Sequence, residues 1–241
     1  MFIPLHDKNA LRFIPFQIVT VGLIAVNVAV YLWQQSLDEA SFLAVVYAGG
    51  LTPTTLFGGV PLPPDLDAFP VAVTLFTHIF LHASWLHLIG NMVFLWVFGD
   101  NVEDAMGHAR FLAFYVASGI AGGLAHAWFE PASAAPLIGA SSATSGIIGA
   151  YLLLYPRVKV WVLMLMRIPL RLPALWALVS WVAFQAYFAL SGTWSENAWW
   201  AHLGGFAAGL ALTPFLRRPG VPLFGPIASP NQEAVRAPRF R

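Results

Sequence analysis

The chain has 241 residues, of which 59% are hydrophobic and 10% charged, and its formal net charge is +1. Ordinary soluble domains contain about 45–50% apolar and about 25% charged residues, so a soluble core of this size could not bury so much apolar surface. The composition therefore excludes a soluble globular protein and indicates a polytopic membrane protein. The chain has no cysteine, which excludes disulfides, thiolate nucleophiles and cysteine-ligated metals.

Six apolar segments have about the length of membrane-spanning helices, which need about 20 mainly apolar residues. They lie at residues 13–33, 84–99, 110–128, 141–156, 172–190 and 198–216, and none of them contains Asp or Glu. The first segment is too long for a signal-peptide core and has no small-residue cleavage site near its end, so we expect it to be retained. The expected fold class is all-α, with six transmembrane helices in one membrane domain at residues 13–216.

The segments outside these spans differ in character. Residues 1–12 form a short N-terminal segment, and residues 36–73 form a long first loop rich in Pro and Gly. Residues 74–83 are apolar but contain His78 and His82, so we expect a re-entrant or interfacial lead-in to the second span. The tail at residues 217–241 is polar and contains prolines, which is typical of a disordered segment.

The charged residues are segregated between the two sets of connections that six spans would create. One set holds every basic residue of the chain: Lys8, Arg12, Arg110, Arg157, Lys159, Arg167, Arg171, Arg217, Arg218, Arg236, Arg239 and Arg241. The opposite set holds acidic residues and no Lys or Arg. By the positive-inside rule, we expect both termini to be cytoplasmic and loop 36–73 to be extracytoplasmic.

Four polar residues are predicted to lie at one level, below the outer surface of the membrane. Ser141 opens the fourth span, His202 lies near the start of the sixth, and His87 and Asn91 lie in the first turns of the second. The fourth span, at about 16 residues and 1.5 Å per residue, covers only ~24 Å of a ~30 Å core, so its start should be recessed. Serine and histidine are the residue types of a hydroxyl nucleophile and its base.

Each of these residues also has a simpler interpretation. A serine before an apolar helix is usually an N-cap, and His87 with Asn91, four residues apart on one helix face, could serve as interhelical hydrogen-bonding groups. His78 and His82 have the spacing of a zinc-binding pair. His108 and His126 have no evident partners and are interpreted as loop and packing residues. Gly205 and Gly209 form a small-xxx-small pattern that is typical of close helix packing.

Taken together, the motifs are specific. The order His82-Ala-Ser-Trp-Leu-His87-Leu-Ile-Gly-Asn91, then Gly139-Ala-Ser141, then Ala201-His202-x-x-Gly205-x3-Gly209 resembles the rhomboid intramembrane serine proteases, in particular their bacterial members. The resemblance implies a six-helix core in the bacterial inner (plasma) membrane, with its active site open to the extracytoplasmic side. It implies cleavage of single-span membrane proteins within the lipid bilayer, with no cofactor, metal or nucleic acid; the oligomeric state stays open.

By motif position, the resemblance implies Ser141 as the nucleophile and His202 as the general base. It implies His87 and Asn91 as oxyanion donors, with His82 as a neighbouring accessory residue. Ser142 stands where the family usually has Gly, and we expect its side chain to narrow the site or to act as a cap or backbone-bonding group. Ser145 stands where some members have an aromatic residue that stacks on the histidine, so His202 must be oriented differently.

Two alternative functions remain open at this point. The first is a catalytically inactive relative that binds membrane clients, which is motivated by Ser142. The second is a histidine-based metal or haem carrier, motivated by His78, His82, His87 and His126.

Overall fold

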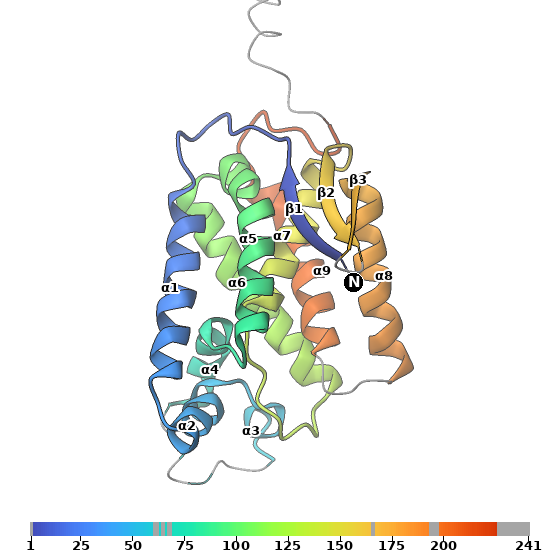
Figure 1. Ribbon diagram of the computed structural model, residues 1–241. Coiled ribbons are helices and arrows are strands. Elements are labelled where there is room, and N and C mark those ends of the chain that lie inside the picture. The colour runs from blue at the N-terminus through green and yellow to red at the C-terminus, as the bar shows by residue number, and fades with distance from the viewer. Residues whose placement is uncertain are drawn as a thin grey trace, which may run out of the picture.

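The structure, a computed structural model, describes residues 2–59, 63, 66, 69–164, 167–192 and 198–225. Its helices are α1 (Ile18–Gln35), α2 (Glu39–Gly49), α3 (Pro53–Leu56), α4 (Val71–Thr77), α5 (Trp85–Met106), α6 (His108–Phe129), α7 (Ser141–Leu154), α8 (Ala174–Ser191) and α9 (Trp199–Leu216), with a short 3-10 helix, η1, at His78–Phe80. Figure 1 shows α1 and α8 on opposite sides of a bundle, with α5, α6, α7 and α9 between them. The prediction of a disordered tail falls mainly on residues 226–241, outside the described residues.

The long apolar helices lie where the sequence predicted spans, but not all of them reach the length of a span. By length and composition, α1, α6 and α8 could each cross a membrane, and α4–η1 with α5 forms a further candidate bent by 81°. The bend agrees with the re-entrant or interfacial segment predicted for residues 74–83. Helix α7 has only 14 residues, so at 1.5 Å per residue it covers about 21 Å of a ~30 Å core.

Residues 36–73 are not a simple loop. Helices α2 and α3 lie within them, and α4 begins at Val71. The side chain of Asp38 accepts a hydrogen bond from the backbone N–H of Ser41 and so caps the start of α2. An isolated bridge pairs Leu51 with Leu137, which ties this connection to the segment before α7. These helices were not predicted because α2, with 11 residues, and α3, with 4, are too short to be recognised as spans.

The fold is mainly helical, as predicted, and it also contains a three-stranded antiparallel sheet that the sequence did not predict. Strand β1 (Phe2–Asp7) pairs with β2 (Lys159–Met164), which pairs with β3 (Ile168–Pro173). Figure 1 shows the sheet in front of α9, between α5 and α8. The partners of β1 lie about 150 residues away in the chain, so local sequence patterns could not reveal this pairing.

Helices α6, α7 and α9 approach one another at glycines. A Cβ at Gly205 would lie 2.0 Å from the carbonyl oxygen of Ser142, and one at Gly209 would lie 2.1 Å from the carbonyl oxygen of Gly146. A Cβ at Gly122 of α6 would lie 2.5 Å from the carbonyl oxygen of Ala201. The backbones of α7 and α9 are therefore in direct contact, as expected for small residues at a membrane helix interface.

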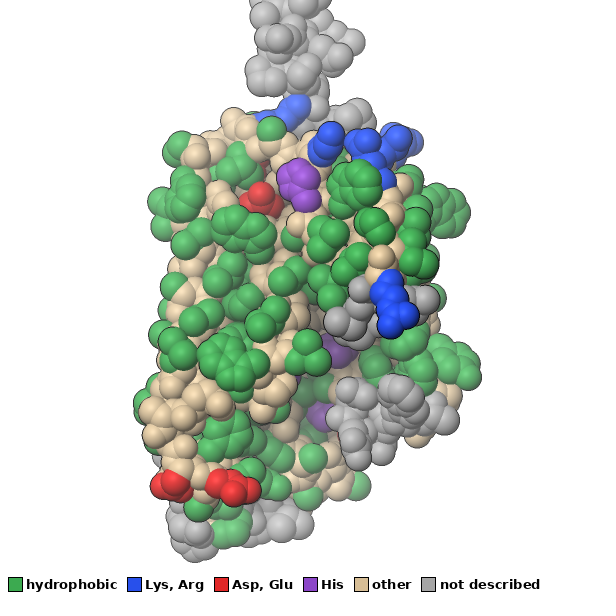
Figure 2. All heavy atoms as spheres, viewed as in Figure 1, with side chains coloured by type: hydrophobic (Ala, Val, Ile, Leu, Met, Phe, Trp, Pro, Cys, Tyr) green, Lys and Arg blue, Asp and Glu red, His purple; other side chains and the backbone are tan. Residues whose placement is uncertain are grey.

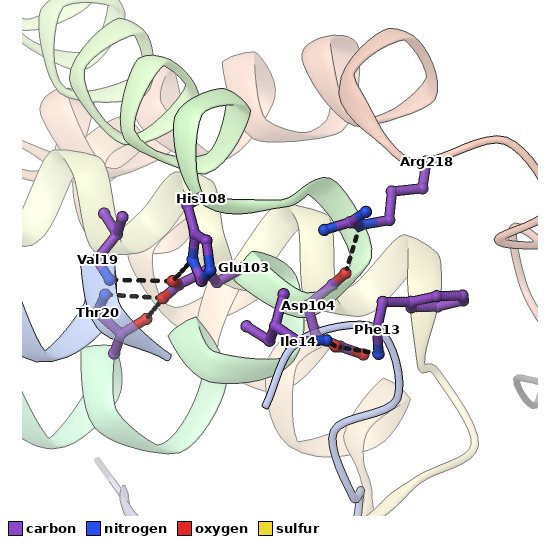
Figure 3. Close-up of polar contacts among 8 residues, drawn as sticks. All are labelled: Phe13, Ile14, Val19, Thr20, Glu103, Asp104, His108 and Arg218. Carbon is purple, nitrogen blue, oxygen red and sulfur yellow. Dashed lines mark hydrogen bonds and ion pairs between the residues drawn. The ribbon is translucent and has the colours of Figure 1, made fainter. Parts of the chain in front are cut away.

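A buried carboxylate near the end of α5 holds the start of α1. Glu103 accepts hydrogen bonds from the backbone N–H groups of Val19 (3.0 Å) and Thr20 (2.8 Å) and from the Thr20 hydroxyl (2.7 Å). It also pairs with His108 (Figure 3). His108 therefore has a partner, which corrects the prediction of a loop residue without one. The sequence missed this pair because α5 continues seven residues past the predicted end at residue 99.

The neighbouring carboxylate holds the segment before α1. Asp104 is 1% exposed and accepts hydrogen bonds from the backbone N–H groups of Arg12 (3.0 Å), Phe13 (2.7 Å) and Ile14 (2.8 Å). The guanidinium of Arg218 donates to the carbonyl oxygen of Asp104 (3.2 Å; Figure 3). A buried carboxylate is stable when its lone pairs are this fully satisfied.

We expect Asp104→Asn to lower the stability of the protein by about 1.5–3 kcal/mol, the range for a hydrogen bond to a charged group. The substitution keeps the shape but turns an N–H₂ group or a neutral oxygen toward backbone donors. Thermal unfolding in detergent, followed by tryptophan fluorescence, measures the effect. Glu130→Gln, at an exposed position after α6, is the matched control, and equal melting temperatures for both variants would contradict the anchoring role of Asp104.

Candidate active site

Ser141 is the first residue of α7, and it lies at the border of the buried region. Its side chain is partly exposed, whereas residues 142–151 are all buried. The hydroxyls of Thr144 and Ser145 donate to the Ser141 carbonyl oxygen at 3.1 and 2.6 Å. Both bonds lie within the first turns of α7 and tie these side chains to the backbone of Ser141.

His202 lies in the first turn of α9 and is held by groups on α8 and α9. Its Nδ1 atom lies 3.1 Å from Oε1 of Gln185. The rings of Trp181 and Trp199 lie 6.2 and 6.1 Å from the imidazole, centroid to centroid. The expectation that His202 is oriented by something other than residue 145 is thereby explained, since Ser145 bonds the backbone of its own helix.

The contact between α7 and α9 brings together the helix starts that carry the candidate nucleophile and base. Ser142 and Ala201, which directly neighbour Ser141 and His202 in the chain, both pack against Gly122 of α6. Within the part of the chain that the structure describes, no hydrogen bond joins the Ser141 hydroxyl to His202. Catalytic hydrogen bonds are often long before substrate binds, so this geometry is compatible with a dyad.

His87 and Asn91 both face the loop before Ser141. A Cβ at Gly139 would lie 2.5 Å from Nε2 of His87 and 3.6 Å from Nδ2 of Asn91. Gly139 has a φ of +118°, and its N–H donates to the carbonyl oxygen of His78 at 2.8 Å. Only glycine combines this backbone conformation with such a close approach. The side chains of His87 and Asn91 on α5 therefore both lie close to Gly139, which is two residues before Ser141 in the chain.

His82 contacts both Asn91 and His87. Its Nε2 atom lies 3.2 Å from Nδ2 of Asn91, which fits the accessory place predicted for it. The backbone of His82 is bonded on both sides by Gln34 of α1: its N–H donates to Oε1 (3.0 Å) and its carbonyl oxygen accepts from Nε2 (3.3 Å). Gln34 was not predicted from the sequence, although a glutamine at the end of an apolar helix is a signal of a buried polar contact.

Ser142 does not behave as predicted. Its side chain is 1% exposed and lies against Gly122, where a Cβ would be 2.5 Å from the Ser142 Cβ. Among the described residues its hydroxyl has no hydrogen-bond partner, so the interpretation as a cap or backbone-bonding group is wrong. The Ser142 side chain therefore points toward α6. Consecutive helical residues point about 100° apart, so Ser141 points in a different direction.

The histidines do not form a cluster typical of a metal site. Nδ1 of His78 lies 2.9 Å from the carbonyl oxygen of Thr74, and Nε2 of His82 is engaged by Asn91. In the described ranges, no group of three or more His, Asp or Glu is arranged to hold a metal ion. The buried carboxylates Glu103 and Asp104 lie toward the other end of α5 from His87, so they do not extend the site.

Comparison with known proteins identifies the family. The Rhomboid domain matches residues 71–219, a range that contains every candidate site residue and most of the helical bundle. The chain is a member of the rhomboid family. The motifs that predicted this relation are those around His82, Ser141 and His202, and the recognition made from them is confirmed.

The relatives include bacterial proteins named as rhomboid proteases and a mitochondrial protein named as a rhomboid. The chain is 32% identical to mitochondrial Rhomboid protein 1 of Saccharomyces cerevisiae over 54% of its own length and 38% of the relative's. It is 44% identical to Rhomboid protease GluP of Bacillus subtilis over 32% of this chain and 15% of that protein. Rhomboid protease GlpG of Serratia proteamaculans is 26% identical over 80% of this chain and 61% of its own length.

These alignments limit what membership implies. They leave out more than a third of each relative's own length. Together with the apolar helices, they support a multi-pass rhomboid membrane protein. Because a mitochondrial protein is among them, the predicted bacterial type remains a prediction.

Proposed function

We propose that this rhomboid is an intramembrane serine endopeptidase that cleaves single-span membrane proteins with a Ser141–His202 dyad. The observation that carries the proposal is the backbone contact of α7 with α9, which brings the first residue of α7 to the first turn of α9. The protease names of several relatives support the same reaction.

In the proposed mechanism, His202 takes the proton of the Ser141 hydroxyl as its oxygen attacks the peptide carbonyl. His202 then gives the proton to the leaving amine. In the second step, His202 takes a proton from the water that attacks the acyl-enzyme and gives it to the Ser141 oxygen as the product leaves. The charge on the tetrahedral oxygen is met by donors from Asn91, His87 and the backbone N–H of Ser141 at the positive end of α7. Loss of one such donor costs on the order of 10²–10³ in turnover in other proteases.

The direct test is labelling with a fluorophosphonate, which reacts with activated serine hydroxyls. The detergent-solubilised protein should be labelled, and peptide mass spectrometry should place the adduct on Ser141. EDTA should leave the labelling rate unchanged, because a hydroxyl nucleophile with a histidine base needs no metal. Loss of labelling in EDTA with recovery in zinc would favour the metal-carrier alternative. A folded protein that is not labelled at all would favour the inactive, client-binding relative.

We further propose that both termini are cytoplasmic and that the dyad faces the outside of an inner (plasma) membrane. Figure 2 shows most of the Lys and Arg side chains of one face at the end where α5 and α7 end, whereas acidic side chains are visible at both ends. Histidine atoms are visible in a hollow of the same face (Figure 2). The positive-inside rule then orients the bundle.

Cysteine labelling tests this orientation cleanly, because the chain has no cysteine of its own. Glu39→Cys at the start of α2 and Lys8→Cys in the N-terminal segment both lie at exposed positions. A membrane-impermeant maleimide should label Glu39→Cys in intact cells and Lys8→Cys only after the membrane is opened. The reverse pattern would overturn the proposed orientation.

A further inference from the structure

Gln185 is a buried amide in a helix that is otherwise almost entirely apolar. Helix α8 has the sequence ALWALVSWVAFQAYFALS, and the Gln185 side chain is only 5% exposed. Two serine hydroxyls of this helix bond within it. Those of Ser180 and Ser191 donate to carbonyl oxygens three residues earlier. Gln185 instead reaches another helix. A polar side chain held inside a membrane protein at a cost is expected to have a specific partner.

The partner of Gln185 is the ring nitrogen of His202 that faces away from catalysis in a dyad. A neutral imidazole has one N–H and one lone pair, and the bond made by one nitrogen decides the state of the other. Oε1 of Gln185 is an acceptor without a proton, so a hydrogen bond to Nδ1 of His202, 3.1 Å away, requires Nδ1 to carry the N–H. Nε2 then holds the lone pair that can accept the Ser141 proton. In serine proteases with a triad, a carboxylate supplies this orienting contact.

The surroundings of the pair restrict the ring further. Trp181, one helical turn before Gln185, is tilted by 34° to the imidazole plane, and Trp199 lies edge-on at 84°. The imidazole is thus flanked by two indole rings, and its Nδ1 atom faces the amide oxygen of Gln185.

We propose that Gln185 is the positioning residue of the dyad, which fixes His202 as the Nδ1–H tautomer with Nε2 free for Ser141. The proposal rests on the proposed protease function and adds the third member that the serine–histidine pair lacks. Gln185 takes the place of a triad carboxylate with a neutral amide, which avoids a buried charge inside the membrane.

The test compares Gln185→Leu with Gln185→Glu. Leucine has a similar volume but no acceptor, so we expect the fluorophosphonate labelling rate and kcat to fall about 10- to 100-fold with little change in KM. This is the range seen when the orienting partner of a metal-ligating histidine is removed. Glutamate restores an acceptor, so Gln185→Glu should recover most of the rate, with the midpoint of its pH profile shifted upward by the added carboxylate. Ser180→Ala, on the same helix but bonded to Ala177, is the matched control and should behave like the unmodified protein.

A second readout does not depend on activity. Nitrogen-15 NMR of histidine-labelled protein distinguishes the two imidazole tautomers, and His202→Ala identifies the signal of His202. We expect the Nδ1–H form in the unmodified protein and in Gln185→Glu, and a mixture of tautomers in Gln185→Leu.

The outcomes separate the two proposals. Unchanged labelling, pH profile and tautomer in Gln185→Leu would overturn the role of Gln185 while leaving the protease function intact. Equal losses in Gln185→Leu and Gln185→Glu, with lowered melting temperatures and the tautomer unchanged, would reduce Gln185 to a packing residue. Absence of labelling at Ser141 in the unmodified protein would overturn the protease function, and the NMR result would still decide the tautomer.

Discussion

Replacing Ser141 with alanine is expected to remove nearly all proteolytic activity, and replacing His202 with alanine should do the same. In serine proteases, loss of the nucleophile or the base costs on the order of 10⁶ in kcat, because the two residues act as one unit. For the same reason the double variant Ser141→Ala/His202→Ala should be little worse than either single one. Cleavage of a fluorescent transmembrane substrate in detergent or liposomes measures all three.

The neighbouring serine is the matched control for this experiment. Ser142 packs against α6 with its side chain 1% exposed, so Ser142→Gly should keep activity or raise it and should leave the label on Ser141. All variants should retain the melting behaviour of a folded membrane protein. Substantial cleavage by Ser141→Ala would overturn the assignment of Ser141 as the nucleophile. A label that persists in Ser141→Ala and is lost in Ser142→Gly would move the nucleophile by one residue.

Adding one methyl group at Gly209 is expected to reduce both stability and activity strongly. The Cβ of Gly209→Ala would lie 2.1 Å from the carbonyl oxygen and 2.7 Å from the Cα of Gly146. Both contacts are with backbone, so α7 and α9 must separate. Overpacking of this kind costs about 1–3 kcal/mol, which exceeds the gain in helix propensity of at most about 1 kcal/mol. Because the same interface brings Ser141 to His202, the rate should fall together with the melting temperature.

Gly22→Ala provides the control for the Gly209 substitution. A Cβ at Gly22 of α1 meets nothing within 4 Å, so the same chemical change should be neutral or slightly stabilising there. Thermal unfolding and fluorophosphonate labelling of the two variants separate the effect of packing from that of helix propensity. A Gly209→Ala protein with unaltered melting temperature and labelling would contradict the proposed dependence of the site on the α7–α9 contact.

Much of this protein could be predicted from local patterns in its sequence. Each predicted span corresponds to a helix. The fourth was predicted to begin at Ser141, where α7 begins, and the sixth at residue 198, one residue before the start of α9 at Trp199. Apolar length alone determines such segments, since a backbone in lipid must satisfy its hydrogen bonds within a helix. The motifs around His87, Ser141 and His202 also identified the family.

What the patterns could not predict depends on distant parts of the chain meeting. The pairing of β1 with β2 joins residues about 150 positions apart, and the bonds of Glu103 and Asp104 to the start of α1 span more than 80 positions. The end of α5 was predicted too early because these carboxylates, charged in isolation, are stabilised by backbone donors that only the folded bundle supplies.

The contrast is clearest at the candidate site. The sequence by itself determined the residue types, a hydroxyl, an imidazole and two amide or imidazole donors, because chemistry of this kind needs those groups at helix starts. Only the tertiary structure decided what orients them. Gln34 holds the backbone of His82, and Gln185 holds Nδ1 of His202, from helices whose sequences carry no motif. A hydrogen bond between helices depends on their rotation and depth, and those are set by packing at glycines such as Gly205 and Gly209 rather than by either helix alone.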